Sequence, residues 1–172
     1  GISRKTAYEY QAGSQGGTQY GNVTRVKEYR DAGSTLVRTQ ATEYYPNDVA
    51  GSGTYVVDRP IRQVLADSGG TCRGEMRFLY DGNASYYAPP VRGDLTLARA
   101  AQTACDGSWR DTASAYDAWG NPVSMTDPRG NTATTTVDTS VTTATWPRLY
   151  TYPTATTLPA VGGVNFTTTY AW

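Results

Sequence analysis

The chain has 172 residues with 15 basic and 15 acidic side chains, and it contains no histidine. The missing histidine excludes Ser-His-Asp and Cys-His catalysis and every histidine metal ligand, so no cofactor or metal is predicted. Because the charges balance and are mixed along the chain, no basic stripe exists for a nucleic-acid partner, and no segment is apolar enough for a membrane span.

A short phrase recurs along the chain. It consists of an alternating run that ends in Tyr, a turn rich in Asp, Gly and Asn, and a second alternating run. Alternation with period two indicates a strand with one buried face, and these turn residues either hydrogen-bond the following backbone or tolerate positive φ. Each copy therefore predicts a β-hairpin or two strands of a meander. The residues that carry the phrase are Tyr20, Gly21, Asn22, Tyr80, Asp81, Gly82, Asn83, Tyr116, Asp117, Gly120, Asn121, Gly130 and Asn131.

One segment between the copies admits two interpretations. Residues 95–104 have the propensity of a short helix, but Leu95, Leu97 and Arg99 alternate. We predict a strand there. The 14 tyrosines and the dense threonines also suit a pleated, half-buried surface, so the predicted fold is all-β with helix nearly absent.

Two cysteines, Cys72 and Cys105, lie 33 residues apart, each beside a turn. Two cysteines without histidine leave a tetrahedral metal site short of ligands. We predict a disulfide, as is typical of extracellular proteins; the alternative is two unconnected buried thiols.

Candidate catalytic groups are few. Asp117 and Asp127 lie on successive turns, and a pair of carboxylates is what a glycosidase uses. Because an Asp in a turn usually caps backbone N–H groups, we predict that the chain is not an enzyme. The tripeptide Arg92-Gly93-Asp94 is one that integrins recognise, yet so short a match is more simply a turn between strands.

The recurring residues resemble the YD-repeat, also called the Rhs or rearrangement-hotspot repeat. That pattern has a Tyr-Asp pair, a few residues, Gly-Asn or Gly-Arg, and an apolar residue two positions later. Tyr116-Asp117, Gly120-Asn121 and Val123 fit it fully. The copy 80–83 fits with a shortened turn, and the copy 20–22 lacks the Asp.

The resemblance implies a repeat array of antiparallel β-hairpins in a curved, spiralling sheet, a segment of a hollow β-shell. Residues 1–172 would form a single YD-repeat segment of a much longer chain. Its function would be structural: a secreted or cell-surface bacterial protein whose shell encloses a C-terminal toxin or effector. The partners would be adjacent repeats and the enclosed cargo, and the isolated segment would self-associate through its end strands, around Thr6–Tyr10 and Thr167–Trp172. The alternative function is an adhesion or carbohydrate-binding module that uses exposed Tyr and Trp.

Overall fold

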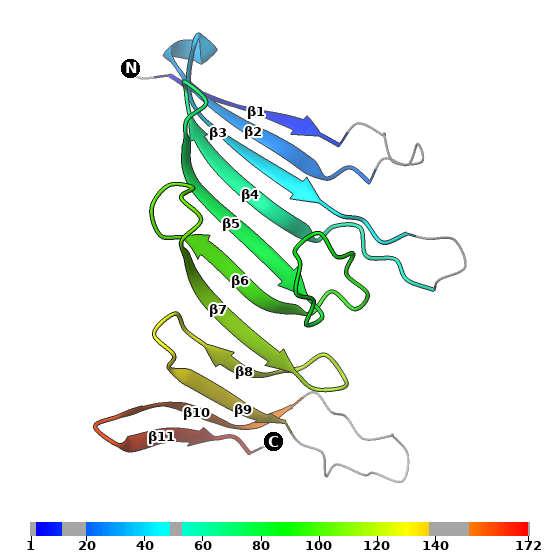
Figure 1. The fold of residues 1–172 in the computed structure, drawn as a ribbon, viewed down its shortest axis with the longest axis vertical. Coiled ribbons are helices and arrows are strands. Elements are labelled where there is room, and N and C mark those ends of the chain that lie inside the picture. The colour runs from blue at the N-terminus through cyan, green and yellow to red at the C-terminus, as the bar shows by residue number, and fades with distance from the viewer. Residues whose placement is uncertain (1–2, 12–19, 49–52, 138–151, 172) are drawn as a thin grey trace. The chain divides into compact units, whose positions relative to one another are not determined.

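The structure, a computed structural model, describes residues 3–11, 20–48, 53–137 and 152–171. Eleven strands follow one another in chain order in one open antiparallel sheet, and no α-helix occurs in these ranges (Figure 1). The predicted all-β antiparallel meander is therefore confirmed. The elements are β1 (Arg4–Tyr10), β2 (Val23–Arg30), a 3-10 turn η1 (Asp31–Gly33), β3 (Thr35–Tyr44), β4 (Pro60–Asp67), β5 (Cys72–Tyr80), β6 (Leu95–Ala101), β7 (Trp109–Tyr116), β8 (Pro122–Thr126), β9 (Thr132–Val137), β10 (Pro153–Val161) and β11 (Val164–Thr169).

The chain divides into two compact units, Gly1–Arg110 and Asp111–Trp172. The first holds β1 to β6 and the start of β7, and the second holds the remainder of β7 and β8 to β11. Within the first unit, β6 pairs with β5 so that Arg99 lies opposite Arg77 and Leu97 opposite Leu79. The strand predicted for the segment after residue 94 is thus confirmed, because cross-strand pairing outweighs the local helix propensity.

The core of the first unit is small. Ile61, Leu79 and Tyr80 are its buried apolar residues, with exposed fractions of 2%, 4% and 5%. The buried Pro90 comes from the connection between β5 and β6, and its carbonyl oxygen accepts a 2.8 Å hydrogen bond from Asn47 Nδ2. The Tyr80 hydroxyl donates to the carbonyl of Pro60 at 2.8 Å, so the one polar atom of this buried ring has a partner.

The second unit places no described side chain in the fully buried class. Threonine pairs link its strands: the hydroxyls of Thr126 and Thr132 lie 2.8 Å apart, and those of Thr157 and Thr167 lie 3.0 Å apart. Such cross-strand pairs each contribute roughly 0.2–1 kcal/mol to a sheet. The hairpin of β10 and β11 turns at 162–163, where two glycines have φ of +60° and +81°, as a tight primed turn requires.

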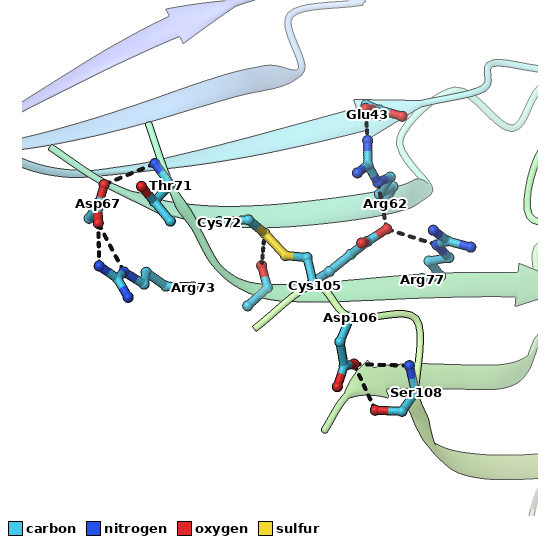
Figure 2. The surroundings of a disulfide bond; sticks show 12 residues. Glu43, Arg62, Asp67, Thr71, Cys72, Arg73, Arg77, Cys105, Asp106 and Ser108 are labelled. Atoms are coloured by element: carbon cyan, nitrogen blue, oxygen red, sulfur yellow. Dashed lines mark hydrogen bonds and ion pairs between the residues drawn. A yellow bond between two sulfur atoms is a disulfide. The ribbon is translucent and has the colours of Figure 1, made fainter. Parts of the chain in front are cut away.

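The two cysteines are joined, as the sequence predicted. Their Cα atoms lie 6.0 Å apart, and the bond connects the first residue of β5 to the loop between β6 and β7 (Figure 2). A parallel bridge between Gly74 and Ala104 lies beside it. The disulfide therefore attaches the loop between β6 and β7, which runs back beside β5, to the first residue of that strand.

We expect replacement of both Cys72 and Cys105 with Ala to destabilise the first unit. The bond closes a loop with a sequence separation of 33, for which the chain-entropy model gives roughly 3–4 kcal/mol. Urea unfolding of the double variant and of the oxidised parent measures the difference. Equal free energies of unfolding would contradict a stabilising role.

Candidate functional site: repeated turns and a charged face

The turn after β7 is held together by the carboxylate of Asp117. Its Oδ1 accepts hydrogen bonds from the backbone N–H groups of Trp119 at 2.8 Å and Asn121 at 2.9 Å, and its Oδ2 accepts one from Asn121 Nδ2 at 2.9 Å. Gly120 has φ of +88°, which closes the three-residue loop in the left-handed region. Tyr116 ends the preceding strand opposite Pro122.

The turn after β8 repeats this arrangement. Asp127 Oδ1 accepts from the N–H of Arg129 at 2.8 Å and of Asn131 at 2.9 Å, while Oδ2 accepts from Asn131 Nδ2 at 2.9 Å. Gly130 has φ of +84°. In both turns the pKa of the Asp lies below its ordinary value, first because the Asn side chain donates to the carboxylate. A carboxylate held ionised in this way serves as an acceptor and is poorly suited to donate a proton.

A third copy of the turn follows β4, where the sequence predicts a turn at Gly69-Gly70 but not this Asp-capped arrangement. Asp67 Oδ1 accepts from the N–H groups of Gly69 and Thr71, both at 2.9 Å, and Gly70 has φ of +82°. Arg73 replaces the Asn side chain and reaches Asp67 Oδ2 at 2.9 and 2.6 Å (Figure 2). The shared signal is therefore Asp-x-x-Gly followed by Asn or Thr, which we call the Asp turn; neither an upstream Tyr nor a Gly-Asn pair is needed.

The copy at 80–83 is built differently. Asp81 has φ of +58°, and Gly82 has φ of +74°. Its carboxylate reaches out of the turn and accepts hydrogen bonds of 2.7–3.3 Å from four successive backbone N–H groups, those of residues 91–94. Burial opposes ionisation of Asp81, but these donors hold its pKa below the ordinary value. Asn83 donates its own N–H to the carbonyl of Tyr80 at 3.0 Å.

The hydrogen bonds that Asp81 accepts from residues 91–94 also fix the backbone of the tripeptide Arg92-Gly93-Asp94. Its backbone N–H groups all bind Asp81, and Arg92 Nε lies 3.1 Å from Asp94 Oδ2. The Asp94 side chain is 19% exposed. The two charged side chains thus face each other, and a receptor that reads both would first have to separate them.

The copy at 20–22 joins the β1–β2 connection to the segment before β4. Gly21 has φ of +73°. Asn22 Nδ2 donates to the carbonyl of Val57 at 2.6 Å and to Gln11 Oε1 at 3.3 Å. The Tyr20 hydroxyl donates to Asp48 Oδ2 at 2.8 Å. This copy therefore makes long-range contacts instead of an Asp turn.

A charged cluster lies across β3, β4 and β5, and only the strand register assembles it. Glu43 pairs with Arg62, and Arg62 with Arg77. Glu75 is the one buried charged residue of the described chain, and its Oε1 accepts from Arg62 Nε at 2.7 Å and Arg77 Nε at 2.8 Å (Figure 2). Arg62 Nη1 also donates to Glu43 Oε1 at 2.8 Å. Burial raises the pKa of Glu75, but the two guanidiniums outweigh it, so the pKa lies below the ordinary value.

The guanidinium of Arg77 also contacts two aromatic rings that lie outside the charged cluster. Its guanidinium carbon lies 4.7 Å from the ring centroid of Tyr86 and 4.5 Å from that of Trp109. Such contacts add roughly 0.5–2 kcal/mol and fix the guanidinium plane. The charged cluster thus connects β3, β4 and β5 to one another and, through Arg77, to the loop after β5.

A groove of about 490 Å³ lies at the end of the first unit where the β1–β2 and β3–β4 connections meet. Tyrosines and prolines line it together with amide and carboxylate groups. Its lining includes Tyr20, Tyr44, Tyr45, Pro46, Asp48 and Gln11. The Tyr45 side chain is 43% exposed. An exposed ring beside hydrogen-bonding groups suits a neutral polar ligand.

Neither a protein-family model nor a curated protein sequence matches the chain. Within the described ranges, no group of three or more Cys, Asp or Glu residues could hold a metal ion. No helix in the described part of the chain is long and apolar enough to cross a membrane.

We expect Gly130→Val to destabilise the second unit more than Asp127→Asn. A side chain added at Gly130 would meet no atom within 4 Å, so its cost comes from the φ of +84° and not from crowding. A β-branched residue there costs about 1–3 kcal/mol. Asn at 127 keeps an oxygen for the two backbone donors. Thermal unfolding of both variants measures the order, and Gly130→Asn, which tolerates positive φ, is the matched control. Equal losses for the Val and Asn variants at 130 would contradict the backbone explanation.

We expect the stability contributed by Glu75 to disappear in acid. Its pKa in the folded chain is lower than in the unfolded chain, where Glu titrates at about 4.3. The contribution is therefore complete above that value and is lost as the pH falls through the folded pKa. Glu75→Gln should cost about 1–3 kcal/mol at neutral pH, because charge-assisted hydrogen bonds are lost.

Unfolding free energies of Glu75→Gln and the parent, measured from pH 7 to 3, should converge as the pH falls. Glu28→Gln is the control, since Glu28 also pairs with an arginine, Arg38, but both partners are exposed. It should change stability little at any pH. A constant difference between Glu75→Gln and the parent would contradict the assignment.

Proposed function

We propose that the chain is a structural wall segment of a secreted YD-repeat protein whose sheet encloses a C-terminal toxin or effector. The observation that carries the proposal is a meander of strands with very few buried residues, joined by a repeated turn. An ordinary domain packs two layers around one core. Here the buried apolar side chains of the described chain are Ile61, Leu79, Tyr80 and Pro90, all in the first unit.

The Asp turn supports an extensible sheet. In each copy the Asp donates its N–H to the carbonyl of the residue four positions later, at 2.9–3.0 Å, and the carboxylate caps the turn. All of these bonds lie within five consecutive residues. Each hairpin thus forms from local contacts and meets its neighbours through strand pairing, as repeat proteins do. Further strands of the same kind would extend the sheet without a new core.

The ionised state of the Asp117 and Asp127 carboxylates supports a structural function and not catalysis. A glycosidase needs one carboxyl that stays protonated near neutral pH. Asp117 and Asp127 are both held ionised by turn donors, and the pKa of each is lowered. We propose that neither acts as an acid.

The full-length protein provides the test. We expect the reading frame around residues 1–172 to encode many further Asp turns, and the region after them to resist limited proteolysis in the folded protein. Deleting residues 109–126, which removes the paired strands β7 and β8 and keeps the alternation of strand direction, should expose that region to cleavage. Digestion at equal rates with and without the deletion, or a frame without further repeats, would refute an enclosing wall.

The tyrosine-lined groove favours a second candidate, a carbohydrate-binding module. Tyr45 offers an exposed ring face, and Asp48 and Gln11 lie in the same lining. Saccharides are commonly bound by an aromatic face flanked by hydrogen-bonding side chains. A glycan array of the parent chain and of Tyr45→Ala tests it. Tyr87→Ala, which removes another exposed tyrosine outside the groove, is the control. Binding that is lost only in Tyr45→Ala would favour this candidate over the wall.

A further inference from the structure

The last strand of the described sheet leaves one edge open. β11 pairs with β10, and no other described strand pairs with it. All six of its residues are exposed. Neither β10 nor β11 contains a charged residue, and β11 contains no proline. Natural edge strands are usually defended by charge, proline or a bulge against pairing with another chain. β11 carries neither charge nor proline, and the register shift of the β10–β11 pair places its extra residue on β10, between Leu158 and Val161.

The register shows which backbone groups of β11 point outward. Tyr170 donates its N–H to the carbonyl of Thr154 at 2.9 Å, so these two residues form a hydrogen-bonded pair. Hydrogen-bonded and non-hydrogen-bonded pairs alternate in an antiparallel ladder. Phe166, opposite Leu158, is therefore bonded to β10. Asn165 and Thr167 direct their N–H and C=O groups to the open side.

We infer that the occupant of this edge is a second copy of the same strand, antiparallel and centred on Phe166. In that register each Asn165 exchanges two backbone hydrogen bonds with Thr167 of the other copy. Phe166 then lies opposite Phe166 of the other copy in a non-hydrogen-bonded pair, where side chains are closest. The inference does not rest on the proposed function.

Side-chain chemistry selects this register. Leu158 lies beside Phe166 on the same face, and the two are 52% and 54% exposed. Pairing about Phe166 produces a continuous apolar row of Leu, Phe, Phe and Leu across four strands. A register centred on Thr167 would place each Phe opposite a Thr, and it would give up the aromatic pair.

The composition of the opposite edge favours a closed dimer over a fibre. β1 carries Arg4, Lys5 and Glu9, the kind of charges that protect an edge strand. A two-fold contact uses the same edge of both copies and leaves no further open site of the same kind. The contact involves one short strand per copy, so the dimer should be weak and concentration-dependent.

Single cysteine variants of the whole chain test the register, since Cys72 and Cys105 are already joined. Across the two-fold axis, Phe166→Cys brings Cα atoms to about 4.5 Å, within disulfide range. In Asn165→Cys the matching atoms lie diagonally, about 7–8 Å apart. Under mild oxidation we expect Phe166→Cys to dimerise roughly tenfold faster or more. Equal rates, or faster cross-linking at another position of β11, would overturn the inference.

Sedimentation equilibrium tests the dimer without a cross-link. Thr167→Pro removes an outward N–H and no backbone bond to β10, so it should weaken the dimer roughly tenfold or more while the sheet spectrum is kept. It also removes the hydroxyl contact with Thr157, and Thr167→Val, which removes only that contact, is its control. If the Pro variant unfolds, Thr167→Lys replaces it, with Thr6→Lys on β1 as its matched control. Only the change on β11 should shift the chain to monomer. A parent chain that is monomeric at all concentrations, or a shift caused equally by Thr6→Lys, would overturn the inference.

Discussion

The acceptance of backbone N–H groups by a turn carboxylate is the interaction on which the remainder of the sheet depends. A three-residue loop leaves amide groups that the two strands cannot bind, and an Asp immediately before the loop binds them locally. The loop length then fixes the register beside the turn, and in two of the hairpins the register shifts by one residue just beyond it, between Leu65 and Ala66 and between Ala115 and Tyr116. Because side chains alternate with period two, a slip of one residue would exchange the two faces of a strand. The Asp turns and these register shifts together thus determine which side chains share a face.

That constraint explains the charged cluster. Arg62 lies between Glu43 and Arg77 only in the register that the turn at Asp67–Thr71 and the one-residue shift between Leu65 and Ala66 together impose on β4 and β5. Burying Glu75 costs solvation free energy, and two guanidiniums offset the cost only when both are in place. A slipped register would leave a buried carboxylate alone. The charged cluster therefore raises the free energy of a slipped strand pairing more than it lowers the free energy of the native pairing.

The sequence predicted what depends on local chemistry. Alternation with Gly-Asn turns indicated the all-β meander, the strand at Leu95–Ala101 and the turn at Asp117–Asn121, and an even cysteine count indicated the disulfide. The sequence indicated a turn at Gly69-Gly70, beside Cys72, but not its likeness to the turns at Asp117 and Asp127, because the repeat was recognised by a Tyr before the Asp or by Gly-Asn after it, whereas the three turns share Asp-x-x-Gly followed by Asn or Thr. The spacing of Asp67 and Gly70 would have revealed it.

What could not be predicted depends on contacts between distant parts of the chain. Asp81 binds the N–H groups of residues 91–94, and nothing in its own turn indicates that its carboxylate leaves it. Glu75 has Arg73 and Arg77 two residues away on its own strand, but Arg73 binds Asp67, and the second guanidinium at Glu75 comes from Arg62 of β4. The groove beside Tyr45 likewise forms from connections far apart in the sequence.

A sheet built from local turns has no intrinsic limit on its number of strands. Each added hairpin brings its own turn contacts and needs only a neighbouring edge. Termination must therefore come from the composition of the outer strands, and the two outer strands of this chain differ. β1 carries charges of both signs, whereas β11 presents threonines, an asparagine, a valine and a phenylalanine. An edge without charge is suited to accept a strand, whether from a following repeat or from another copy, and the sheet can thus be extended at β11 more readily than at β1.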